Sequence, residues 1–330
     1  MILHVHRVLV STIIAGILIT NVPYSQAQVD TPEGTSQMPY LNVPLPTMGG
    51  TQVWTDHRNI NGWRLQQNVI TGHWRLLDPS DIRRAWGDRE SCQNKFPQLT
   101  DSELEAAAPK EVVILLHGLM RSKHSMRGLK KRLEACEDAP QVIEFSYAST
   151  RSGIADHAAA LREVVESLPG TPKINFVGHS MGNIVVRHAI GDWQNSSDPC
   201  NVLSRLDRIV MIGPPNQGAA IARRLGKLGL FKVITGQGGM ELGPIWTDLE
   251  ARLATPPCPF AVIAGDLPSG IPQNPLVDGN SDFVVSVDEA RLEGAEVFRT
   301  VPHIHSFMMD QQEVQDIVID FLELSENTES

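Results

Sequence analysis

Clusters of lysine and arginine are missing from this sequence of 330 residues, and basic residues are in the minority. It has 28 Lys and Arg residues against 38 Asp and Glu residues, which gives a formal net charge of −10 at pH 7. Nucleic acids are polyanions that bind basic patches, so we expect no nucleic-acid partner. The acidic balance also disfavours strong attraction to anionic membranes and favours neutral or cationic substrates.

Cysteine is also scarce, with four residues in the chain: Cys92, Cys136, Cys200 and Cys258. None forms a CxxC pair or a Cys/His spacing typical of zinc ligands, so we expect no metal site. Four cysteines allow three full disulfide pairings, and buried free thiols are the alternative. The sequence does not choose between them.

Long hydrophobic runs are missing beyond the N-terminus. The apolar run at residues 8–20 is shorter than the ~20 residues needed to span a bilayer. Ser25-Gln26-Ala27 then places small residues at positions −3 and −1 of a cleavage site after Ala27. This pattern predicts a secretory signal peptide over residues 1–27 and a secreted or periplasmic protein. An uncleaved N-terminal anchor is the alternative. A lipid anchor is not indicated, because no cysteine lies near the cleavage site.

Two regions precede the part of the chain that is richest in apolar segments. Residues 28–53 are rich in Pro, Gly, Thr and Ser, which predicts a flexible N-terminal lead. Residues 54–110 predict an extension packed on the edge of the main sheet, and within it the polar residues 81–104 predict a loop with a short helix. A β-hairpin is predicted from two strand-like segments and the turn-like stretch between them: Trp63–Leu65, His73–Leu77 and Asn68–Gly72.

From Glu111 onward, strand-like and helix-like segments alternate. Several strand-like segments are continuous Val, Ile and Leu runs, as expected when helices cover both faces of a parallel sheet. The alternation predicts an α/β domain over residues 111–330, with a doubly wound, mostly parallel sheet flanked by helices. The predicted strands are Val112–Leu116, Val142–Tyr147, Ile174–Val177, Ile209–Ile212, Phe260–Ala264 and Glu296–Val301.

The clearest motif is Gly-His-Ser-Met-Gly at residues 178–182, between a predicted strand and an apolar helical stretch at Ile184–Ile190. This is the context of the G-x-S-x-G nucleophile elbow, in which a serine stands on a tight turn between strand and helix. Glycines leave room where a side chain would collide, and the free N–H groups at the helix start favour negative charge. We therefore predict that Ser180 is a nucleophile; a purely structural turn is the alternative.

With this motif, the chain resembles an α/β-hydrolase of the lipase/esterase type over roughly residues 111–324. Residues 115–120 (Leu-Leu-His-Gly-Leu-Met) are similar to the His-Gly loop after the third strand of such enzymes. The resemblance implies an oxyanion hole formed by the backbone N–H groups of Leu119 and Met181, which would stabilise the charge that develops on a substrate carbonyl oxygen. His117 is expected to bond local backbone. Residues 213–218 (Gly-Pro-Pro-Asn-Gln-Gly) resemble a bacterial lipase-like segment and are expected to shape the pocket rim.

A serine hydroxyl needs a base near neutral pH, and the superfamily order is Ser, then Asp or Glu, then His. Of the eleven histidines, only His303 and His305 follow all predicted strands and precede the final helical segment. Residues 302–308 resemble the family's terminal segment, in which the histidine precedes a small hydroxyl residue and apolar residues. This favours His305 as the base, with His303 as the alternative.

Three acids follow the strand Phe260–Ala264 and are candidates for the third member: Asp266, Asp278 and Asp282. The segment from Asp282 resembles the family pattern of Asp, one variable residue and a β-branched pair that leads into a short helix ending near Ala290. This favours Asp282, which would orient the histidine ring and stabilise its charged form. Asp266 is at the strand end, where many family members place the acid, so it stays an alternative together with Asp278.

These residues predict an exported serine hydrolase that cleaves small-molecule or lipid esters through Ser180, Asp282 and His305, without a cofactor. Peripheral membrane contact is compatible with a lipid substrate, and the oligomeric state is open. The same residues could serve a thioesterase, an acyltransferase or an amidase, or the fold could be a non-catalytic binding scaffold. Residues 219–253 contain many apolar side chains and predict either a small lid over the site or an ordinary helix packed on the sheet.

Overall fold

A computed structural model describes residues 45–47, 52–97, 108–219, 222, 241–242 and 246–325. The predicted signal peptide, most of the predicted lead and most of the predicted lid segment lie outside these described residues. Within them, no helix is long and apolar enough to cross a membrane. All four cysteines are free thiols in the structure, and Cys92 and Cys136 are buried.

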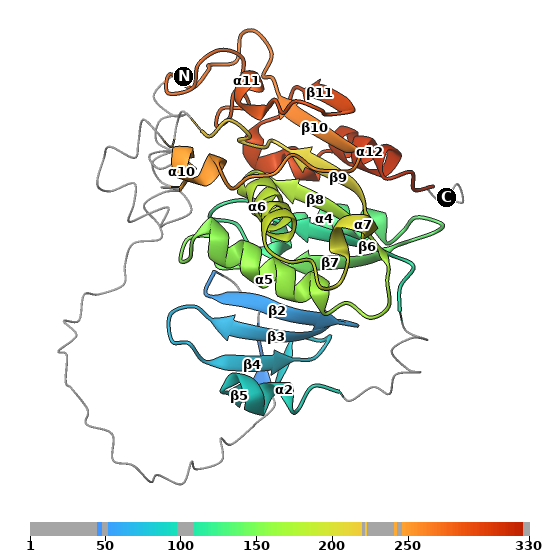
Figure 1. Ribbon diagram of the computed structural model, residues 1–330. Helices are drawn as coiled ribbons and strands as arrows, with labels where there is room; N and C mark the ends of the chain where they lie inside the picture. Colours follow the sequence, from blue (N-terminus) through green and yellow to red (C-terminus); the bar gives the residue numbers. More distant parts are fainter. Residues whose placement is uncertain are drawn as a thin grey trace, which may run out of the picture. The chain divides into compact units, whose positions relative to one another are not determined.

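The larger sheet has six strands in the order β11-β10-β9-β8-β6-β7, and every neighbouring pair is parallel (Figure 1). This confirms the predicted α/β fold with a parallel sheet, and each strand overlaps a predicted one. The strands are β6 (Glu111–Leu116), β7 (Gln141–Phe145), β8 (Lys173–His179), β9 (Leu206–Ile212), β10 (Phe260–Gly265) and β11 (Val297–Val301).

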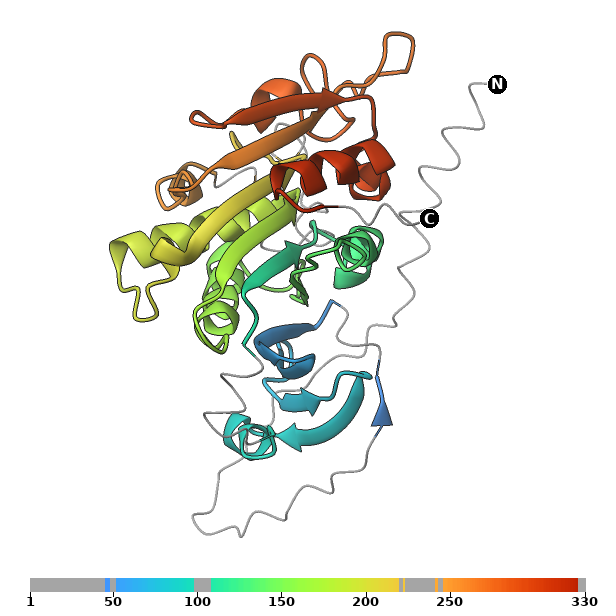
Figure 2. The same cartoon turned by 90° about the vertical axis from the view of Figure 1, so that its right-hand side faces the viewer.

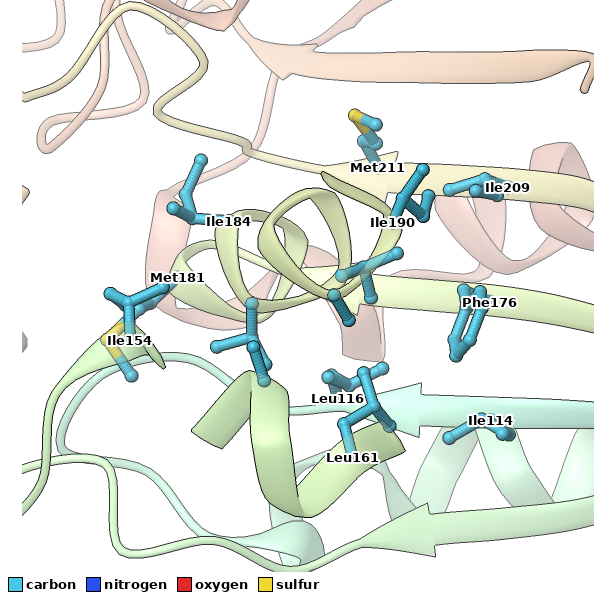
Figure 3. Packing of buried hydrophobic residues seen from close by; sticks show 14 of the residues in the cluster. Ile114, Leu116, Ile154, Leu161, Phe176, Met181, Ile184, Ile190, Ile209 and Met211 are labelled. Carbon is cyan, nitrogen blue, oxygen red and sulfur yellow. The ribbon is translucent and has the colours of Figure 1, made fainter. Parts of the chain in front are cut away.

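Helices cover both faces of this sheet, which explains why several of its strands, such as β6 and β10, are almost entirely apolar. Along β6, Ile114 and Leu116 pack into the cluster that contains the apolar sides of α5 (Ile154–Glu166) and α6 (Met181–Asn195), as Figure 3 shows. The alternate strand residues, such as Leu115, point to the other face. That face packs on α4 (Arg127–Leu133) and α12 (Gln312–Phe321), and α12 appears beside the sheet in Figure 2. Shorter helices are α2 (Arg89–Gln93), η1 (Lys123–Met126), α7 (Val202–Arg205), α10 (Trp246–Glu250), α11 (Val287–Ala290) and η2 (His305–Asp310).

A second, antiparallel sheet precedes the parallel one. Its order is β1-β5-β4-β3-β2, and the predicted hairpin is confirmed as its β3–β4 pair. The turn of this hairpin is stabilised by Asn68, whose Oδ1 accepts the N–H groups of Ile70 at 3.0 Å and Thr71 at 3.1 Å. The strands are β1 (Leu45–Pro46), β2 (Trp54–Ile60), β3 (Trp63–Asn68), β4 (Trp74–Leu77) and β5 (Ile82–Gly87).

One prediction for this region was wrong, because residues 81–104 contain a strand before the expected short helix. The strand is β5, which pairs with both β1 and β4. Two arginines give it a polar appearance, but their side chains lie against partners of the same sheet. Arg83 stacks over the ring of Trp86 at 5.5 Å, and Arg84 Nε donates to Asp78 Oδ2 at 2.7 Å. Stacking and hydrogen bonding thus hold these polar side chains against neighbouring residues at the surface of the strand.

The antiparallel sheet is bonded to the chain that follows edge strand β7. The N–H of Asp56 on β2 donates to the carbonyl of Ser146 at 2.9 Å, and the N–H of Ser146 donates to Asp56 Oδ2 at 2.8 Å. Asp56 is fully buried, and its Oδ1 accepts Nε2 of Gln66 at 2.6 Å. The contact therefore satisfies backbone groups at the sheet edge and a buried carboxylate at once.

Two buried histidines flank Tyr147, directly beyond β7. The ring of His117 stacks on the ring of Tyr147, with centroids 4.1 Å apart. The ring of His157, on α5, is tilted against the ring of Tyr147, with centroids 4.8 Å apart. The Tyr147 hydroxyl donates to the carbonyl of His117, and His117 Nδ1 lies 2.9 Å from the carbonyl of Gly118. These contacts match the structural role predicted for His117. Burial lowers the pKa of His117 to about 4 and the pKa of His157 to about 3.

These depressed pKa values predict a loss of stability in mild acid. Each histidine binds a proton near pH 6.5 in the unfolded chain but stays neutral in the fold, so its contribution is fully present above pH 6.5. The contribution is lost as the pH falls from 6.5 toward 4, by about 2 kcal/mol per histidine at pH 5. Urea unfolding should give a lower free energy of unfolding at pH 5 than at pH 7.5. This difference should be smaller by about 2 kcal/mol in His157→Gln. An unchanged difference in the variant would contradict this assignment.

Candidate active site

Ser180 stands at the turn between β8 and α6, at the C-terminal edge of the parallel sheet. Its backbone has φ 54° and ψ −122°, a conformation that is strained for a residue with a side chain. The surrounding hydrogen bonds hold it there. Its N–H donates to the carbonyl of Ile212 at 2.9 Å, and its carbonyl accepts Nδ2 of Asn183 at 3.1 Å. The predicted elbow is therefore present, with the serine side chain on the outside of a sharp turn.

The two glycines of the motif are required by close packing. A Cβ atom on Gly178 would lie 2.3 Å from Oδ1 of Asn183, and one on Gly182 would lie 2.8 Å from the carbonyl oxygen of Leu116. Neither space admits a side chain without movement of the backbone. The elbow thus packs α6 closely against the ends of β8 and β6, and these contacts keep Ser180 in its strained conformation.

His305 is the first residue of η2, which follows β11. Its Nε2 atom lies 2.9 Å from Oγ of Ser180, within hydrogen-bond distance of the hydroxyl. The side chain is 7% exposed and Ser180 is 8% exposed, so the pair is screened from bulk water. This is the geometry that a general base needs in order to take the proton of a serine hydroxyl.

Asp282 lies in the loop after β10 and is hydrogen-bonded to His305 on the side away from Ser180. Its Oδ2 atom lies 2.6 Å from Nδ1 of His305, and its side chain is 1% exposed. Its other oxygen, Oδ1, accepts the N–H groups of Val284 at 2.9 Å and Val285 at 2.7 Å. The loop is tight, since Phe283 has a φ of 86°. These bonds fix the carboxylate so that His305 carries its proton on Nδ1 and leaves Nε2 free to accept.

The alternative residues lie elsewhere. His303, between β11 and η2, has its Nε2 atom 3.0 Å from Oε2 of Glu313 on α12, in a partly exposed pair. Asp266 accepts Nδ2 of Asn280 at 3.1 Å and so ties together the two ends of the long loop after β10. Asp278 is exposed on that loop. The structure therefore brings together Ser180, His305 and Asp282 and leaves the other three candidates out.

The predicted oxyanion donors flank the serine. Met181 is the first residue of α6, so its N–H lacks an acceptor within the helix. Leu119 belongs to the loop after β6, which runs close to the elbow. A Cβ atom on Gly118 would lie 3.1 Å from Cβ of Ser180. The next residue, Met120, has a φ of 60°, so the loop turns sharply away beside the serine. Both predicted donors thus come from segments that meet at Ser180.

Sequence reasoning missed a polar network behind the elbow. Arg187 of α6 is 5% exposed and donates Nε to the carbonyl of Ala254 at 2.9 Å and Nη1 to Oδ1 of Asn216 at 3.1 Å. Burial lowers the pKa of Arg187 to about 10. Asn216 Nδ2 in turn donates to the carbonyl of Ala290 at 2.9 Å. The network joins α6, the 213–218 segment and α11, and the signal for it was an arginine directly after the apolar run Ile184–Val186 of α6.

The 213–218 segment also lies beside the site. A Cβ atom on Gly213 would lie 3.1 Å from Nδ1 of His305, so this residue forms part of the wall around the histidine. Among the described residues, His, Cys, Asp and Glu side chains form no group of three or more that could hold a metal ion. The chemistry that these groups can perform is proton transfer and nucleophilic attack by serine.

Comparison with known proteins agrees with this geometry. Residues 106–213, which include β6, the elbow and β9, match the family model described as "Putative serine esterase (DUF676)". No curated protein matches the sequence. Among solved structures, the mature lipase BlEst2 of Bacillus licheniformis has a TM-score of 0.50 and 18% identity, over 65% of this chain and 92% of the lipase.

Two further structures have lower scores. A gene product of Listeria innocua has a TM-score of 0.45 and 16% identity, over 65% of this chain and 94% of its own. A metagenomic carboxyl esterase has a TM-score of 0.45 and 16% identity, over 59% of this chain and 64% of its own. At such identities the likeness to the Bacillus lipase shows the fold. The chain therefore has the fold of the α/β-hydrolases, and its residues 106–213, which include the elbow, are similar to that serine esterase family.

Proposed function

We propose that the protein hydrolyses carboxylic esters, with Ser180 as nucleophile, His305 as general base and acid, and Asp282 as the residue that orients His305. The observation that carries the proposal is the continuous hydrogen-bonded series from Asp282 Oδ2 through His305 to Ser180 Oγ, at 2.6 and 2.9 Å. Its serine stands on a strained elbow at a helix N-terminus, as this chemistry requires.

The reaction would proceed in two halves. His305 Nε2 takes the proton of Ser180 Oγ while that oxygen attacks the ester carbonyl, and the N–H groups of Leu119 and Met181 stabilise the oxyanion. The tetrahedral intermediate collapses when the protonated His305 gives its proton to the leaving alcohol, which leaves an acyl group on Ser180. Water, deprotonated by His305, then attacks the acyl carbonyl and releases the acid, and the proton returns to Ser180.

The surface around the site favours a substrate with an apolar part. Met120 beside the predicted oxyanion loop is 47% exposed, and Ile304 and Phe307 on either side of His305 are 46% and 54% exposed. Large exposed apolar side chains are costly in water, and their placement within two residues of site groups favours a surface that binds apolar ligands. We therefore propose acyl esters, either small or lipid, as the substrate class.

We also propose that the protein is exported and matures by cleavage after Ala27. The support is the sequence pattern of an apolar run at residues 8–20 followed by small residues at the −3 and −1 positions. Intact-mass analysis and N-terminal sequencing of protein recovered from the periplasm or medium should give a chain that begins at Gln28. A membrane-bound chain that retains Met1 would instead favour an uncleaved anchor.

The proposed activity is tested with p-nitrophenyl esters of short, medium and long acyl chains. The unaltered protein should hydrolyse them, and Ser180→Ala should lower kcat by roughly 10⁴–10⁶-fold because the nucleophile is gone. Ser204→Ala is the control, since this serine is exposed on α7 and far along the chain from the elbow. Folded protein that hydrolyses no ester would refute the proposal, and parallel assays with thioesters, amides and acceptor alcohols would then test the other acyl-transfer reactions.

The assignment of the acid and the base is tested separately. Asp282→Asn should lower kcat by about 10⁴-fold with the fold intact, because the amide favours the wrong tautomer of His305. The matched variants Asp266→Asn and His303→Gln should leave kcat within about threefold, since both side chains bond partners away from Ser180. A large loss of kcat in either control, with Asp282→Asn active, would transfer the role to that residue.

A further inference from the structure

His179, the residue before the nucleophile, makes a contact that the proposed mechanism does not use. Its side chain is buried, with 2% of the residue exposed, and its Nε2 atom lies 2.9 Å from the backbone carbonyl oxygen of His305. The two rings are close, with centroids 4.9 Å apart and planes tilted by 45°. One histidine of the elbow thus bonds the main chain of the histidine that faces Ser180.

The contact defines which nitrogen of His179 carries the proton. A carbonyl oxygen only accepts hydrogen bonds, so Nε2 must donate and Nδ1 is the bare nitrogen of the neutral ring. Nδ1 is buried without a hydrogen-bond partner, and a Cβ atom on Gly118 would lie 2.9 Å from it. Burial above all, and then the neighbouring His305, hold the pKa of His179 well below its usual range. His179 therefore stays neutral, in one tautomer, while His305 gains and loses a proton.

The main chain of His305 is held from both sides. Its N–H donates to the carbonyl of Asp282 at 3.0 Å, and its carbonyl accepts Nε2–H of His179 at 2.9 Å. The next carbonyl, that of Ser306, accepts Nη2 of Arg121 at 2.8 Å. Successive peptide groups are thus tied to the acid loop, to the elbow and to the loop after β6. These three segments carry the groups that must act together on a substrate.

We infer that His179 is a positioning residue, which holds the backbone of His305 to the elbow so that the imidazole stays aligned with Oγ of Ser180. The inference rests on the proposed function, because alignment matters only if His305 takes the proton of Ser180. Misplacement of a reacting group by about 1 Å can cost on the order of 10²-fold in rate. Loss of the bond should therefore lower the rate of the chemical step and leave substrate binding nearly unchanged.

The test compares His179→Leu with His179→Gln. Leucine fills much of the space but donates no hydrogen bond, whereas the amide nitrogen of glutamine can take the place of Nε2. His188→Leu is the control, since His188 is equally buried on α6 but its Nδ1 atom lies 3.2 Å from Asp192 on the same helix. Two experiments are done with each variant. The first gives kcat and KM with a p-nitrophenyl ester, and the second gives the second-order rate constant of labelling by an alkyl fluorophosphonate. In the labelling step, Ser180 Oγ forms a bond to phosphorus, fluoride leaves and His305 takes the proton.

We expect His179→Leu to lower both kcat and the labelling rate by about 10- to 100-fold, with KM within about twofold. His179→Gln should recover both rates to within about threefold of the unaltered protein, even if its melting temperature matches that of His179→Leu. A merely structural role predicts instead that both variants and His188→Leu lose activity in proportion to their lost stability. That pattern, or full activity in His179→Leu, would overturn the inference while leaving the serine hydrolase in place. An unaltered protein that reacts with neither reagent would overturn the proposed function, and the inference with it.

Discussion

The backbone of Ser180 has a positive φ of 54° with a ψ of −122°, and the close contacts of α6 with β8 and β6 keep it there. Close approach at Gly178 and Gly182 removes the room that a relaxed turn would need. Such strain is retained only where the surrounding packing determines it, and here that packing is the apolar cluster between the sheet, α5 and α6. The position of one oxygen atom thus depends on the core of the whole parallel domain.

The direction of the strands brings the remaining groups to the same place. Because β6, β8, β10 and β11 are parallel, the segments that follow them all emerge at one edge of the sheet. The loop after β6 lies against the elbow, the loop after β10 carries Asp282, and the segment after β11 begins with His305. The hydrogen bonds among these segments, several of them to backbone carbonyls, convert this convergence into a fixed geometry.

Local patterns predicted the features that depend on neighbouring residues. The runs of Val, Ile and Leu predicted the parallel strands, and the glycine-serine motif predicted the elbow between a strand and a helix. The strand β5 was not predictable in this way, because Arg83 stacks on Trp86 and Arg84 pairs with Asp78, and such contacts leave no apolar pattern in the sequence. Likewise, the contacts of Arg187 with Asn216 and of His179 with His305 join residues 29 and 126 positions apart, and no local pattern encodes them.

The bond between Asp56 and Ser146 bears on how the chain avoids joining with copies of itself. A parallel sheet ends in an edge strand whose free N–H and carbonyl groups are a template for another chain. Here β2 bonds both backbone groups of Ser146, the residue directly after edge strand β7, so the antiparallel sheet occupies the positions into which pairing along this edge would continue. Because β2 precedes β7 in the chain, it is already synthesised when Ser146 and the edge strand emerge from the ribosome.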